Sequence, residues 1–523
     1  SNSLFIDFTS KEKVIYMFAK IKSLGLFGLD AFIVDVEASI DRGIPAFDIV
    51  GLPDAAVRES RNRVRSTIKN VGLDFPISKI TINLAPADIK KEGAIYDLPI
   101  LIAIMAASGQ LNVNLNSCAF LGELSLNGEV KPIKGTLAML SKAKELGINT
   151  AFIPKENEAE GAVIDCINTY PTDNIENLIL HLTGQKKLPR AKLNNTTKAE
   201  NFELLDFSQV KGQFQAKRAL EIAAAGGHNV LLIGPPGSGK SMLAKRLPSI
   251  LPDMTLEESI ETSKIYSIAG LLPLGTSLLK KRPFRSVHHT ISPAGLAGGG
   301  SIPKPGEISL AHNGVLFLDE LPEFARASME VLRQPIEDRK VTISRVNGTL
   351  SYPCSIMLIA AMNPCPCGYY GHPTKKCICS KKLVKKYLSK VSGPLLDRID
   401  IQVEVAPVDF EKLSTYQGKE SSESIKERVD KARIIQANRY KGSNVTYNAL
   451  ITPDMLEKHC QLSDNARALF KKAFENLNLS ARAYDRILKV SRTIADLACS
   501  EIIKSSHVAE AVQYRNLDQK YWK

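Results

Sequence analysis

The stretch NVLLIGPPGSGKS, residues 229–241, decides the fold of the region around it. Its four apolar residues Val230–Ile233 predict a buried strand, and MLAKRLPSIL, which follows it, has the apolar spacing of a helix. The residues that match the pattern G-x-x-x-x-G-K-[ST] are Gly234, Gly239, Lys240 and Ser241. The strand–turn–helix context favours a phosphate-binding loop over an ordinary glycine-rich turn.

This loop has the chemistry needed to hold a polyphosphate. Glycines let the backbone curl, so that its N–H groups and the start of the helix face the phosphates. Lys240 can reach the β- and γ-phosphates, and Ser241 can ligand Mg²⁺. The residues predicted to bind ATP and Mg²⁺ here are Gly234, Pro235, Pro236, Gly237, Ser238, Gly239, Lys240 and Ser241.

The length and composition of the chain limit the number of domains, the class of protein and the kind of partner. A chain of 523 residues is too long for one ordinary core and indicates about three domains. The hydrophobic content of 44% and the charged content of 24% are normal for a globular protein. The net charge of +13 favours an anionic partner, most simply nucleic acid, with solubility alone as the alternative.

No segment predicts a membrane or secretory protein. The longest apolar run, around Leu98–Ala107, is too short to span a bilayer. Asp7, Lys11 and Glu12 do not resemble the start of a signal peptide, and Met17 is a candidate native start. The nine cysteines, four clustered and the rest scattered, do not form a disulfide framework. We expect a cytoplasmic protein without membrane contact.

Residues 1–184 alternate short β-rich runs with helical ones. The predicted strands are 31–37, 79–83 and 151–157, and the predicted helices are 54–70, 99–108 and 137–146. Asn127-Gly128 predicts a hairpin turn within 122–133. The segments 122–135 (GELSLNGEVKPIKG) and 143–160, with KKEG upstream, resemble the proteolytic domain of Lon proteases. The resemblance implies a ribosomal S5-like α+β domain.

The same resemblance argues against peptidase activity. Lon proteases use a serine–lysine dyad, and the alignment puts Ile95 at the serine position and Leu137 at the lysine position. Ser108 and Lys134 lie nearby at other offsets. A nucleophile needs its base, and here neither is present. We therefore expect a non-catalytic domain.

Residues 185–204 are polar, basic and without periodicity, which predicts an exposed interdomain linker rather than a loop inside one domain. We expect a P-loop core with a parallel sheet over 205–405, beginning with a helix over 206–227, and a helical lid over 406–523. The whole chain is thus predicted as a multidomain α/β protein.

The second half of the nucleotide site follows two further apolar runs. Val315–Leu318 predict a buried strand that ends in Asp319 and Glu320, about 80 residues after the phosphate loop, as this fold class requires. Asp319 can hold Mg²⁺, and Glu320 can polarise the attacking water; a solvated loop acid is the alternative for Glu320. The strand predicted over 356–363 ends in Asn363, which resembles the sensor that aligns this water.

Residues 393–400, GPLLDRID, carry Arg398. They resemble the Leu-Leu-x-Arg-Phe-Asp segment of replicative minichromosome-maintenance helicases and of the magnesium chelatase ATPase subunit. The resemblance implies an arginine that reaches a neighbouring subunit's γ-phosphate, and hence activity only as a ring. The alternative is an ion pair of Arg398 with Asp397 or Asp400.

Residues 282–314 are glycine-rich and resemble an insertion in the second helix of such motors. His288-His289 lie in this segment. Adjacent histidines face apart on most backbones, so a polar loop is predicted there rather than a metal site.

Residues 339–353 predict a β-hairpin with Asn347-Gly348 at its tip, where related helicases place a pore hairpin. The candidates for contact with DNA phosphates on it are Arg339, Lys340 and Arg345. A purely structural hairpin is an equal alternative.

The loop 363–380 contains four cysteines in the pattern C-x-C, nine residues, C-x-C: Cys365, Cys367, Cys377 and Cys379. Four thiolates on a short loop can close on a structural zinc ion. The alternatives are two disulfides or free thiols, and His372 is a possible substitute ligand.

The densest basic run flanks this loop and consists of Lys375, Lys376, Lys381, Lys382, Lys385, Lys386 and Lys390. The lysines predicted to contact DNA are Lys381, Lys382, Lys385 and Lys386. Tyr369 and Tyr370 could stack on bases or pack the turn.

The C-terminal part has helical spacing, with helix starts at Thr452-Pro453-Asp454 and Ser463-Asp464. Residues 479–498 resemble the second arginine-sensor helix of the motor family. Alignment places Arg482 at the sensor position, with Arg486 as the second choice and a helix-surface charge as the alternative.

Taken together, residues 17–520 resemble the ComM/YifB family of magnesium-chelatase-like AAA+ ATPases. The segments that carry the resemblance are PFRSVHHTIS, GVLFLDELPEF, MNPCPCGYYG and RAYDRILKVSRTIADL. Val287 stands where the family has proline, which affects no catalytic position. The resemblance implies a hexameric, DNA-stimulated ATPase that promotes branch migration in homologous recombination and natural transformation.

Three other functions compete with this interpretation. A metal chelatase motor, or a protein-remodelling ATPase that does not act on DNA, is the main alternative, although the Asp-x-Ser-x-Ser metal motif of the chelatase partner is absent. A Lon-like protease is opposed by Ile95 and Leu137. An ATP-gated scaffold without turnover is opposed by Glu320, Asn363 and Arg398.

Overall fold

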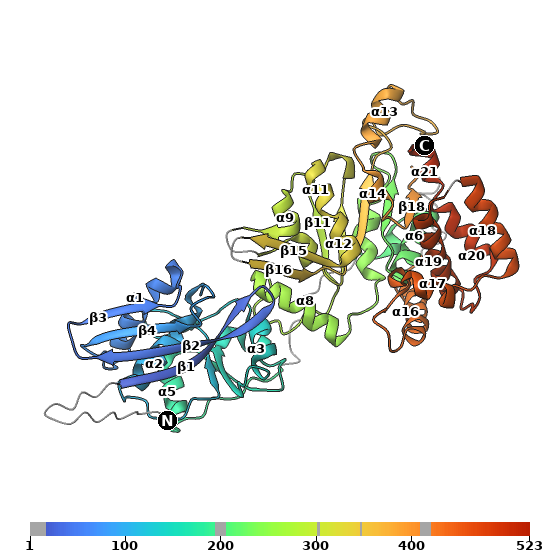
Figure 1. The fold of residues 1–523 in the computed structure, drawn as a ribbon. Helices are drawn as coiled ribbons and strands as arrows, with labels where there is room; N and C mark the ends of the chain where they lie inside the picture. The colour runs from blue at the N-terminus through green and yellow to red at the C-terminus, as the bar shows by residue number, and fades with distance from the viewer. Residues whose placement is uncertain are drawn as a thin grey trace. The chain divides into compact units, whose positions relative to one another are not determined.

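The computed structural model describes residues 17–193, 205–300, 304–345, 348–407, 420–477 and 479–522, with the side chains of residues 345 and 348 left out (Figure 1). The chain divides into two compact units. The first comprises Ser1–Glu200 together with Ser259–Leu279, and the second Asn201–Glu258 together with Lys280–Lys523.

The first unit is built on a seven-stranded sheet with the order β3-β4-β2-β1-β5-β8-β9. Its strands are β1 (Met17–Phe27), β2 (Asp30–Asp41), β3 (Ala46–Val50), β4 (Lys79–Ala85), β5 (Cys118–Phe120), β8 (Thr150–Pro154) and β9 (Asn168–Thr172). Its helices are α1 (Ala55–Asn70), α2 (Asp97–Ala107), α3 (Thr136–Ala143), α4 (Glu158–Gly161) and α5 (Ile175–Leu182). A short hairpin of β6 (Glu123–Leu124) and β7 (Val130–Lys131) completes it.

These elements follow from the sequence pattern. Alternate residues of β2, among them Val34, Val36 and Ala38, are fully buried, as expected for a strand with one face on the core. α1 begins after Asp54, whose carboxylate accepts a hydrogen bond from the N–H of Val57 at 2.8 Å. The strands and helices predicted in this unit are confirmed, although the helix predicted over 137–146 ends at Ala143 and the strand predicted over 151–157 ends at Pro154, where a 3-10 turn over 155–157 follows.

Part of the predicted linker packs on the first unit. The N–H of Leu188 donates to Nδ1 of His181 at 2.9 Å, and that of Ala191 donates to the carbonyl of Thr169 at 2.8 Å. Residues 194–204 lie outside the described residues. The segment Ser259–Leu279, which the sequence places in the motor, also packs with this unit, since α8 (Leu256–Ala269) brings Ser267 to the buried carboxylate of Glu160.

The second unit contains a five-stranded, all-parallel sheet with the order β11-β14-β17-β10-β18. The strands are β10 (Val230–Ile233), β11 (Phe284–Val287), β14 (Val315–Leu318), β17 (Met357–Met362) and β18 (Ile401–Glu404). The three central strands are entirely buried, which explains their continuous apolar sequences. Their carboxyl ends meet at one edge of the sheet, where α/β proteins bind ligands.

The helices along this core are α6 (Phe214–Gly226), α7 (Lys240–Arg246), α9 (Pro293–Ala297), α10 (Glu307–Leu310), α11 (Arg326–Val331), α12 (Arg333–Asp338), α13 (Lys381–Leu388) and α14 (Gly393–Leu396). The predicted hairpin is present as β15 (Lys340–Arg345) and β16 (Gly348–Pro353), but Asn347 at its tip lies outside the described residues. A small ladder joins β12 (Gly298–Gly299) to β13 (Lys304–Pro305).

Two expectations for this unit were wrong in part. The helix predicted over 206–227 begins only at Phe214, because Gly212 and Gln213 have positive φ values of 65° and 58° and break the helical path. The segment 282–314 is more than an insertion, because Phe284–Val287 form the edge strand β11 of the main sheet. The glycines around this strand concealed its four-residue run.

The C-terminal part is helical, as predicted. Its helices are α16 (Ser422–Arg439), α17 (Pro453–His459), α18 (Asp464–Leu477), α19 (Ala481–Leu497), α20 (Ser505–Gln513) and α21 (Leu517–Tyr521). Residues 408–419, at the predicted start of the lid, lie outside the described residues. None of the described helices is long and apolar enough to cross a bilayer.

Candidate active site

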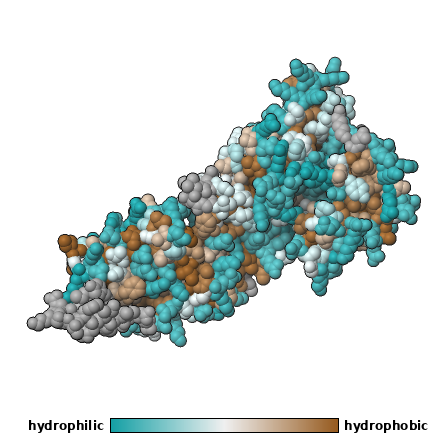
Figure 2. Space-filling view, in the orientation of Figure 1, coloured by the Kyte–Doolittle hydropathy of each residue, from teal (hydrophilic) through white to brown (hydrophobic). Residues whose placement is uncertain are grey.

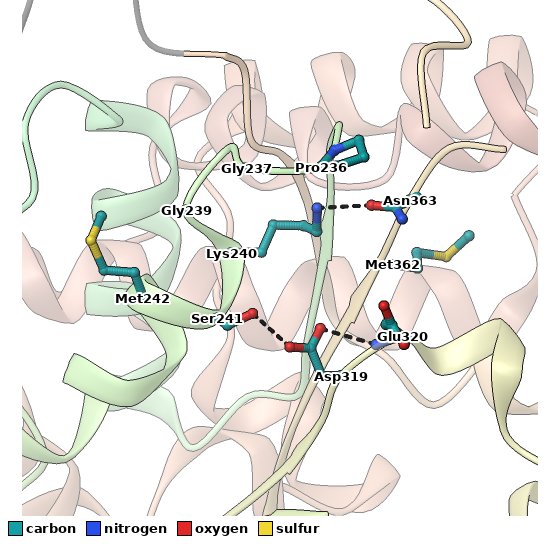
Figure 3. Close-up of a pocket in the computed structure, with 10 residues that line it drawn as sticks. All are labelled: Pro236, Gly237, Gly239, Lys240, Ser241, Met242, Asp319, Glu320, Met362 and Asn363. Atoms are coloured by element: carbon teal, nitrogen blue, oxygen red, sulfur yellow. Dashed lines mark hydrogen bonds between the residues drawn. The ribbon is translucent and has the colours of Figure 1, made fainter. Parts of the chain in front are cut away.

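A cavity of about 360 Å³ opens at the carboxyl edge of the parallel sheet (Figure 3). It is lined by Pro236, Gly237, Gly239, Lys240, Ser241, Met242, Asp319, Glu320, Met362 and Asn363. The loop after β10, the acidic pair after β14 and the amide after β17 thus come together at one place. The structure brings the residues predicted from three separated motifs into a single site.

Lys240 is held at the centre of this site. Its Nζ donates hydrogen bonds to the carbonyls of Gly234 at 2.7 Å and Pro235 at 2.9 Å, and to Oδ1 of Asn363 at 3.1 Å (Figure 3). Burial lowers the pKa of Lys240 to about 8, against the opposing effect of the Asp319 and Glu320 carboxylates. A polyphosphate would replace these neutral oxygen acceptors and supply the negative charge that the ammonium group lacks as a partner.

The oxygen groups needed for a hard divalent cation lie beside the lysine. Ser241 Oγ donates to Oδ2 of Asp319 at 2.6 Å, and Oδ1 of Asp319 accepts from the N–H of Glu320 at 3.0 Å. A hydroxyl and a carboxylate in contact match the oxygen donors that Mg²⁺ prefers. Gly237 and Gly239 have φ values of 76° and 94°, which only glycine adopts readily, and a side chain at Gly234 would clash with the carbonyl of Val405. The curled backbone therefore fits a phosphate chain.

Glu320 lies at the border of the cavity. Its backbone is in the left-handed region, with φ 53°, and its side chain is 57% exposed. Oε2 of Glu320 lies 3.5 Å from Nδ1 of His289. The expectation that His288 and His289 face apart was wrong, because their ring centroids are only 4.1 Å apart and tilted by 34°. The backbone turns sharply after β11 and brings both rings to one side.

Gln213 is a site residue that the sequence analysis missed. Its amide Nε2 donates to the carbonyl of Ser238 in the phosphate loop at 3.2 Å and to that of Ala406 at 2.6 Å. It therefore ties the phosphate loop to the segment after β18. The glycine at position 212, inside an expected helix, was the available signal of a break there.

A second cavity of about 230 Å³ gathers the predicted arginines. The charged residues that line it are Glu337, Arg339, Arg398, Asp400, Arg482, Asp485, Arg486 and Lys489. None of them lines the first cavity. Arg398 and Arg482 thus share a basic cavity distinct from the phosphate loop of their own chain.

The alternative interpretation required an ion pair of Arg398 with Asp397 or Asp400. Arg398 pairs with Glu337 instead. Its Nη2 lies 2.6 Å from Oε2 of Glu337, and its Nη1 donates to the carbonyl of Pro394 at 2.6 Å. The side chain is 10% exposed, and its buried Nε makes no hydrogen bond within the described part of the chain. The Nε is thus a buried donor whose hydrogen-bonding capacity is unmet within the described residues.

The two candidate sensor arginines differ. Arg486 Nη1 donates to Oδ1 of Asp400 at 2.5 Å. Burial acts to raise the pKa of Asp400, but the charge of Arg486 and hydrogen bonding by His228 and the N–H of Asn229 outweigh it and hold this pKa far below its usual range. Arg482 is exposed, and no ion pair engages it among the residues described. The structure thus leaves Arg482 available.

Comparison with known proteins agrees with this arrangement. The family model described as magnesium chelatase, subunit ChlI, matches residues 206–413, that of the subunit ChlI C-terminal matches 419–515, and a further ChlI model matches 36–157. The chain is 43% identical to competence protein ComM of Haemophilus influenzae over 95% of its own length and 97% of that protein. It is 43% identical to YifB of Escherichia coli K12, over 94% of this chain and 96% of that protein.

This chain belongs to the ComM/YifB family of magnesium-chelatase-like AAA+ proteins.

The chain also has a weaker similarity to Lon proteases. The chain is 25% identical to Lon protease of Mycolicibacterium smegmatis, over 30% of this chain and 21% of that protein. In the ComM/YifB-family protein described here, Leu137 is fully buried and its N–H donates to Oε2 of Glu160 at 3.0 Å. Ser108 Oγ donates to the carbonyl of Met105 at the end of α2. Leu137 thus packs in the core, and Ser108 bonds the end of its own helix, so neither forms part of a catalytic dyad.

The four cysteines of the loop 363–380 lie close together. The Sγ atoms of Cys365, Cys367 and Cys377 lie 3.4–3.7 Å apart, and all four sulfurs, with Cys379, lie within 4.8 Å of one another. A tetrahedral zinc ion with bonds of about 2.3 Å needs sulfurs roughly 3.8 Å apart. His372 is not part of this cluster. The cluster could hold a zinc ion.

The backbone around the cluster favours a thiolate at Cys367, whereas burial raises the pKa of Cys365 to about 12. Burial acts to raise the pKa of Cys367, but hydrogen bonds from the backbone of Tyr369 and Ile378 outweigh it and lower this pKa to about 6. Nδ1 of His372 accepts from the N–H groups of Thr374 and Lys375 and braces the turn instead.

The predicted DNA contacts divide into exposed and engaged residues. Lys340 is exposed at the start of β15. Arg339 precedes the hairpin, donates to Tyr447 and Ser355 at 3.1 and 3.2 Å, and lies over the Tyr447 ring. The Arg339 guanidinium is therefore bound within the chain, whereas the sequence predicted that it contacts DNA phosphates. The side chain of Arg345 lies outside what the structure describes.

The lysines of α13 form one exposed basic set, Lys381, Lys382, Lys385 and Lys386. α13 lies at the top of Figure 1, and the same region of Figure 2 is coloured mainly as hydrophilic. Val384, Tyr387 and Leu388 form its buried face. Tyr370 is 38% exposed, whereas Lys375 covers the ring of Tyr369 at 5.0 Å.

Proposed function

We propose that this chain is an ATP-driven, ring-forming DNA motor that promotes branch migration in homologous recombination and natural transformation. One observation carries the proposal: the phosphate loop with its acids and the arginines Arg398 and Arg482 line two different cavities of one chain. A nucleotide in the first cavity therefore needs arginines from another copy. The relative in Haemophilus influenzae is named a competence protein, which supports a role in competence.

ATP would bind in the first cavity, with Lys240 on its β- and γ-phosphates. Ser241 and Asp319 would hold Mg²⁺, which supplies positive charge to the phosphate oxygens when bound. Glu320 would accept the proton of the attacking water, and Asn363, already bonded to Lys240, would orient that water. These residues provide positioning and charge, which is what phosphoryl transfer requires.

Arg398 and Arg482 would face the γ-phosphate held by the neighbouring copy. Glu337, which is 46% exposed, holds the Arg398 guanidinium in the single chain, and a phosphate would replace this carboxylate as its partner. A hexamer, the ring expected from the family, places one such pair at every interface. Arg482 is preferred to Arg486 because Asp400 already engages Arg486.

DNA would contact the β15–β16 hairpin through Lys340 and Arg345, and α13 through its four lysines. The net charge of +13 supports a polyanionic partner. Zinc would be held by Cys365, Cys367, Cys377 and Cys379 and would have a structural role, because four protein ligands leave no open position. Zinc at this place would fix the base from which α13 presents its lysines.

The domain division is also part of the proposal. Residues 205–405 would form the ATPase core and 406–523 the helical lid, while residues 1–184 would form a Lon-like, S5-like domain without peptidase activity. ATP would be the small-molecule substrate, and the protein would act in the cytoplasm.

The experiment is steady-state ATP hydrolysis by the purified chain, alone and with single-stranded, duplex and four-way-junction DNA, with Glu320→Gln as the control. Stimulation by DNA, strongest with branched or single-stranded forms, is expected, as is a loss of about 10²-fold or more in Glu320→Gln. Hydrolysis indifferent to every DNA form would instead support a chelatase-like or protein-remodelling ATPase. Normal turnover by Glu320→Gln would reject this residue as the base.

A further inference from the structure

The cysteine loop, residues 363–380, begins inside the nucleotide site. Its first residue, Asn363, directly follows β17, and its Oδ1 accepts a hydrogen bond from Nζ of Lys240 at 3.1 Å (Figure 3). Cys365, two residues further along the chain, is fully buried and belongs to the cluster of four cysteines. The cluster is therefore separated by only one residue from a side chain that contacts the phosphate-binding lysine.

The cysteine loop also packs on the phosphate loop itself. Gly368 is buried, and a Cβ atom added to it would lie 2.3 Å from Cδ and 2.7 Å from Cγ of Pro236. Pro236 lines the nucleotide cavity, and its ring is rigid, so it cannot rotate away as a flexible side chain would. The N–H of Gly368 donates to the carbonyl of Cys365 at 2.9 Å, which ties this contact directly to the cysteine cluster.

The shape of the cysteine loop depends on its cysteines. Residues 363–380 are all described and contain no helix or strand, so no regular hydrogen-bond ladder fixes them. The four sulfurs lie within 4.8 Å of one another, an arrangement that suits a zinc ion. Free thiols are weak donors and acceptors and hold such a cluster poorly, whereas four metal bonds hold it firmly. Filling of the cysteine site therefore determines how firmly Gly368 is held against Pro236.

We propose that the cysteine loop is a metal-dependent support of the phosphate loop, so that zinc in the cysteine site raises the affinity of the chain for ATP. The inference rests on the proposed function, which supplies both ATP and zinc. A phosphate loop that is already held in its bound shape loses less conformational entropy when the ligand binds. Thermodynamic linkage then requires the reverse effect, in which ATP tightens the binding of zinc by the same factor.

The first test measures both directions of this linkage on the wild-type chain. The probe for the nucleotide site is a fluorescent, non-hydrolysable ATP analogue, and the probe for the cysteine site is the zinc ion. Removal of zinc should raise the Kd for the analogue about tenfold, and renewed addition of zinc should restore it. In competition with a chromophoric chelator, zinc-loaded protein should hold zinc about tenfold more tightly when the analogue is present.

The second test uses two glycines of the cysteine loop as a matched pair. Gly368 and Gly371 have φ values of 83° and 75°, so alanine introduces similar backbone strain at both positions. Only at Gly368 would the new Cβ meet Pro236, because the nearest atom at Gly371, Cε of Lys520, is 3.9 Å away. Gly368→Ala should raise the Kd for the analogue about tenfold and keep its zinc, because it displaces Pro236 from its bound position. Gly371→Ala should stay within about twofold of the wild type.

The outcomes separate this inference from the proposed function. A wild-type chain that binds no ATP analogue, or that takes up no zinc, would reject that part of the proposed function and the inference with it. A chain that binds both, with no effect of either on the affinity for the other, would overturn the inference alone. Equal losses in Gly368→Ala and Gly371→Ala would assign the loss to backbone strain and overturn the contact with Pro236 as its route. If Gly368→Ala does not fold, the effect of the analogue on zinc binding by the wild type still decides.

Discussion

At the scale of single residues, the site depends on charges that the protein holds only partly satisfied. Lys240 is buried among carbonyl groups, and Arg398 keeps a buried Nε without a hydrogen bond in the described part of the chain. A phosphate would give Lys240 an opposite charge in place of neutral acceptors, whereas the buried Nε of Arg398 is a donor without a partner and therefore costly. Residues with such unmet demand are typical of binding sites.

Lys240 predicts a pH dependence of ATP binding. Its pKa of about 8 without nucleotide means that the ammonium is charged below pH 8 and becomes neutral as the pH rises. Bound phosphates raise this pKa, so binding above pH 8 must take up a proton, and the Kd for ATP should rise by up to about tenfold per pH unit there. Fluorescence titration with a nucleotide analogue over roughly pH 7 to 9 measures this slope.

Lys240→Arg is the control for that titration, because its guanidinium stays charged throughout the range. Its Kd, even if weaker, should not change with pH. A wild-type Kd that is constant up to pH 9 would contradict the assignment of a lowered pKa to Lys240.

At the scale of elements, strand register and loop closure decide which side chains meet. β11 was concealed in a glycine-rich segment, and its pairing with β14 brings His289 to Glu320. The cysteine loop closes so that residues ten or more positions apart, such as Cys365 and Cys377, lie 3.7 Å apart. The spacing of the cysteines predicted this cluster, because a loop of nine residues permits a tetrahedral arrangement.

The cysteine loop supports a prediction on metal content and local order. Cys365→Ser should lower the zinc content from about one ion per chain to nearly none, because three thiolates bind far more weakly than four. Limited proteolysis should then cut near α13, whose base the loop forms. Atomic emission on the purified protein, with Cys499→Ser as the exposed-cysteine control, measures the metal. An equal zinc content in the wild type and in Cys365→Ser would contradict the assignment of this zinc site.

At the scale of the whole molecule, the predicted catalytic residues of one chain line two different cavities. The first cavity has the phosphate loop and its acids, and the second has Arg398 and Arg482. Neither cavity alone contains all the groups that ATP hydrolysis in this class requires. Under the proposed function, activity would be a property of an assembly, and this can be tested by mixing inactive chains.

Arg398→Ala and Lys240→Ala should each be inactive alone, the first with normal ATP binding and the second without it. Mixed in equal amounts, they should recover hydrolysis, up to about a quarter of the wild-type rate, because a random quarter of the interfaces joins an intact loop to an intact arginine. Glu337→Gln is the control, since it removes the ion pair of Arg398 but keeps the arginine, and it should remain active. Failure to recover in freshly exchanged rings would show that Arg398 acts within its own chain.

The sequence by itself determined the phosphate loop, the acidic pair, Asn363 and the cysteine cluster, because each is a local pattern whose chemistry requires residues close together in the chain. The tertiary structure alone decided the partners of Arg398 and Arg486, the engagement of Arg339 by Tyr447, and the contact of His289 with Glu320. These depend on strand order and helix packing, which join residues tens to hundreds of positions apart. A long flexible side chain can reach several partners, and only the packed fold selects one of them.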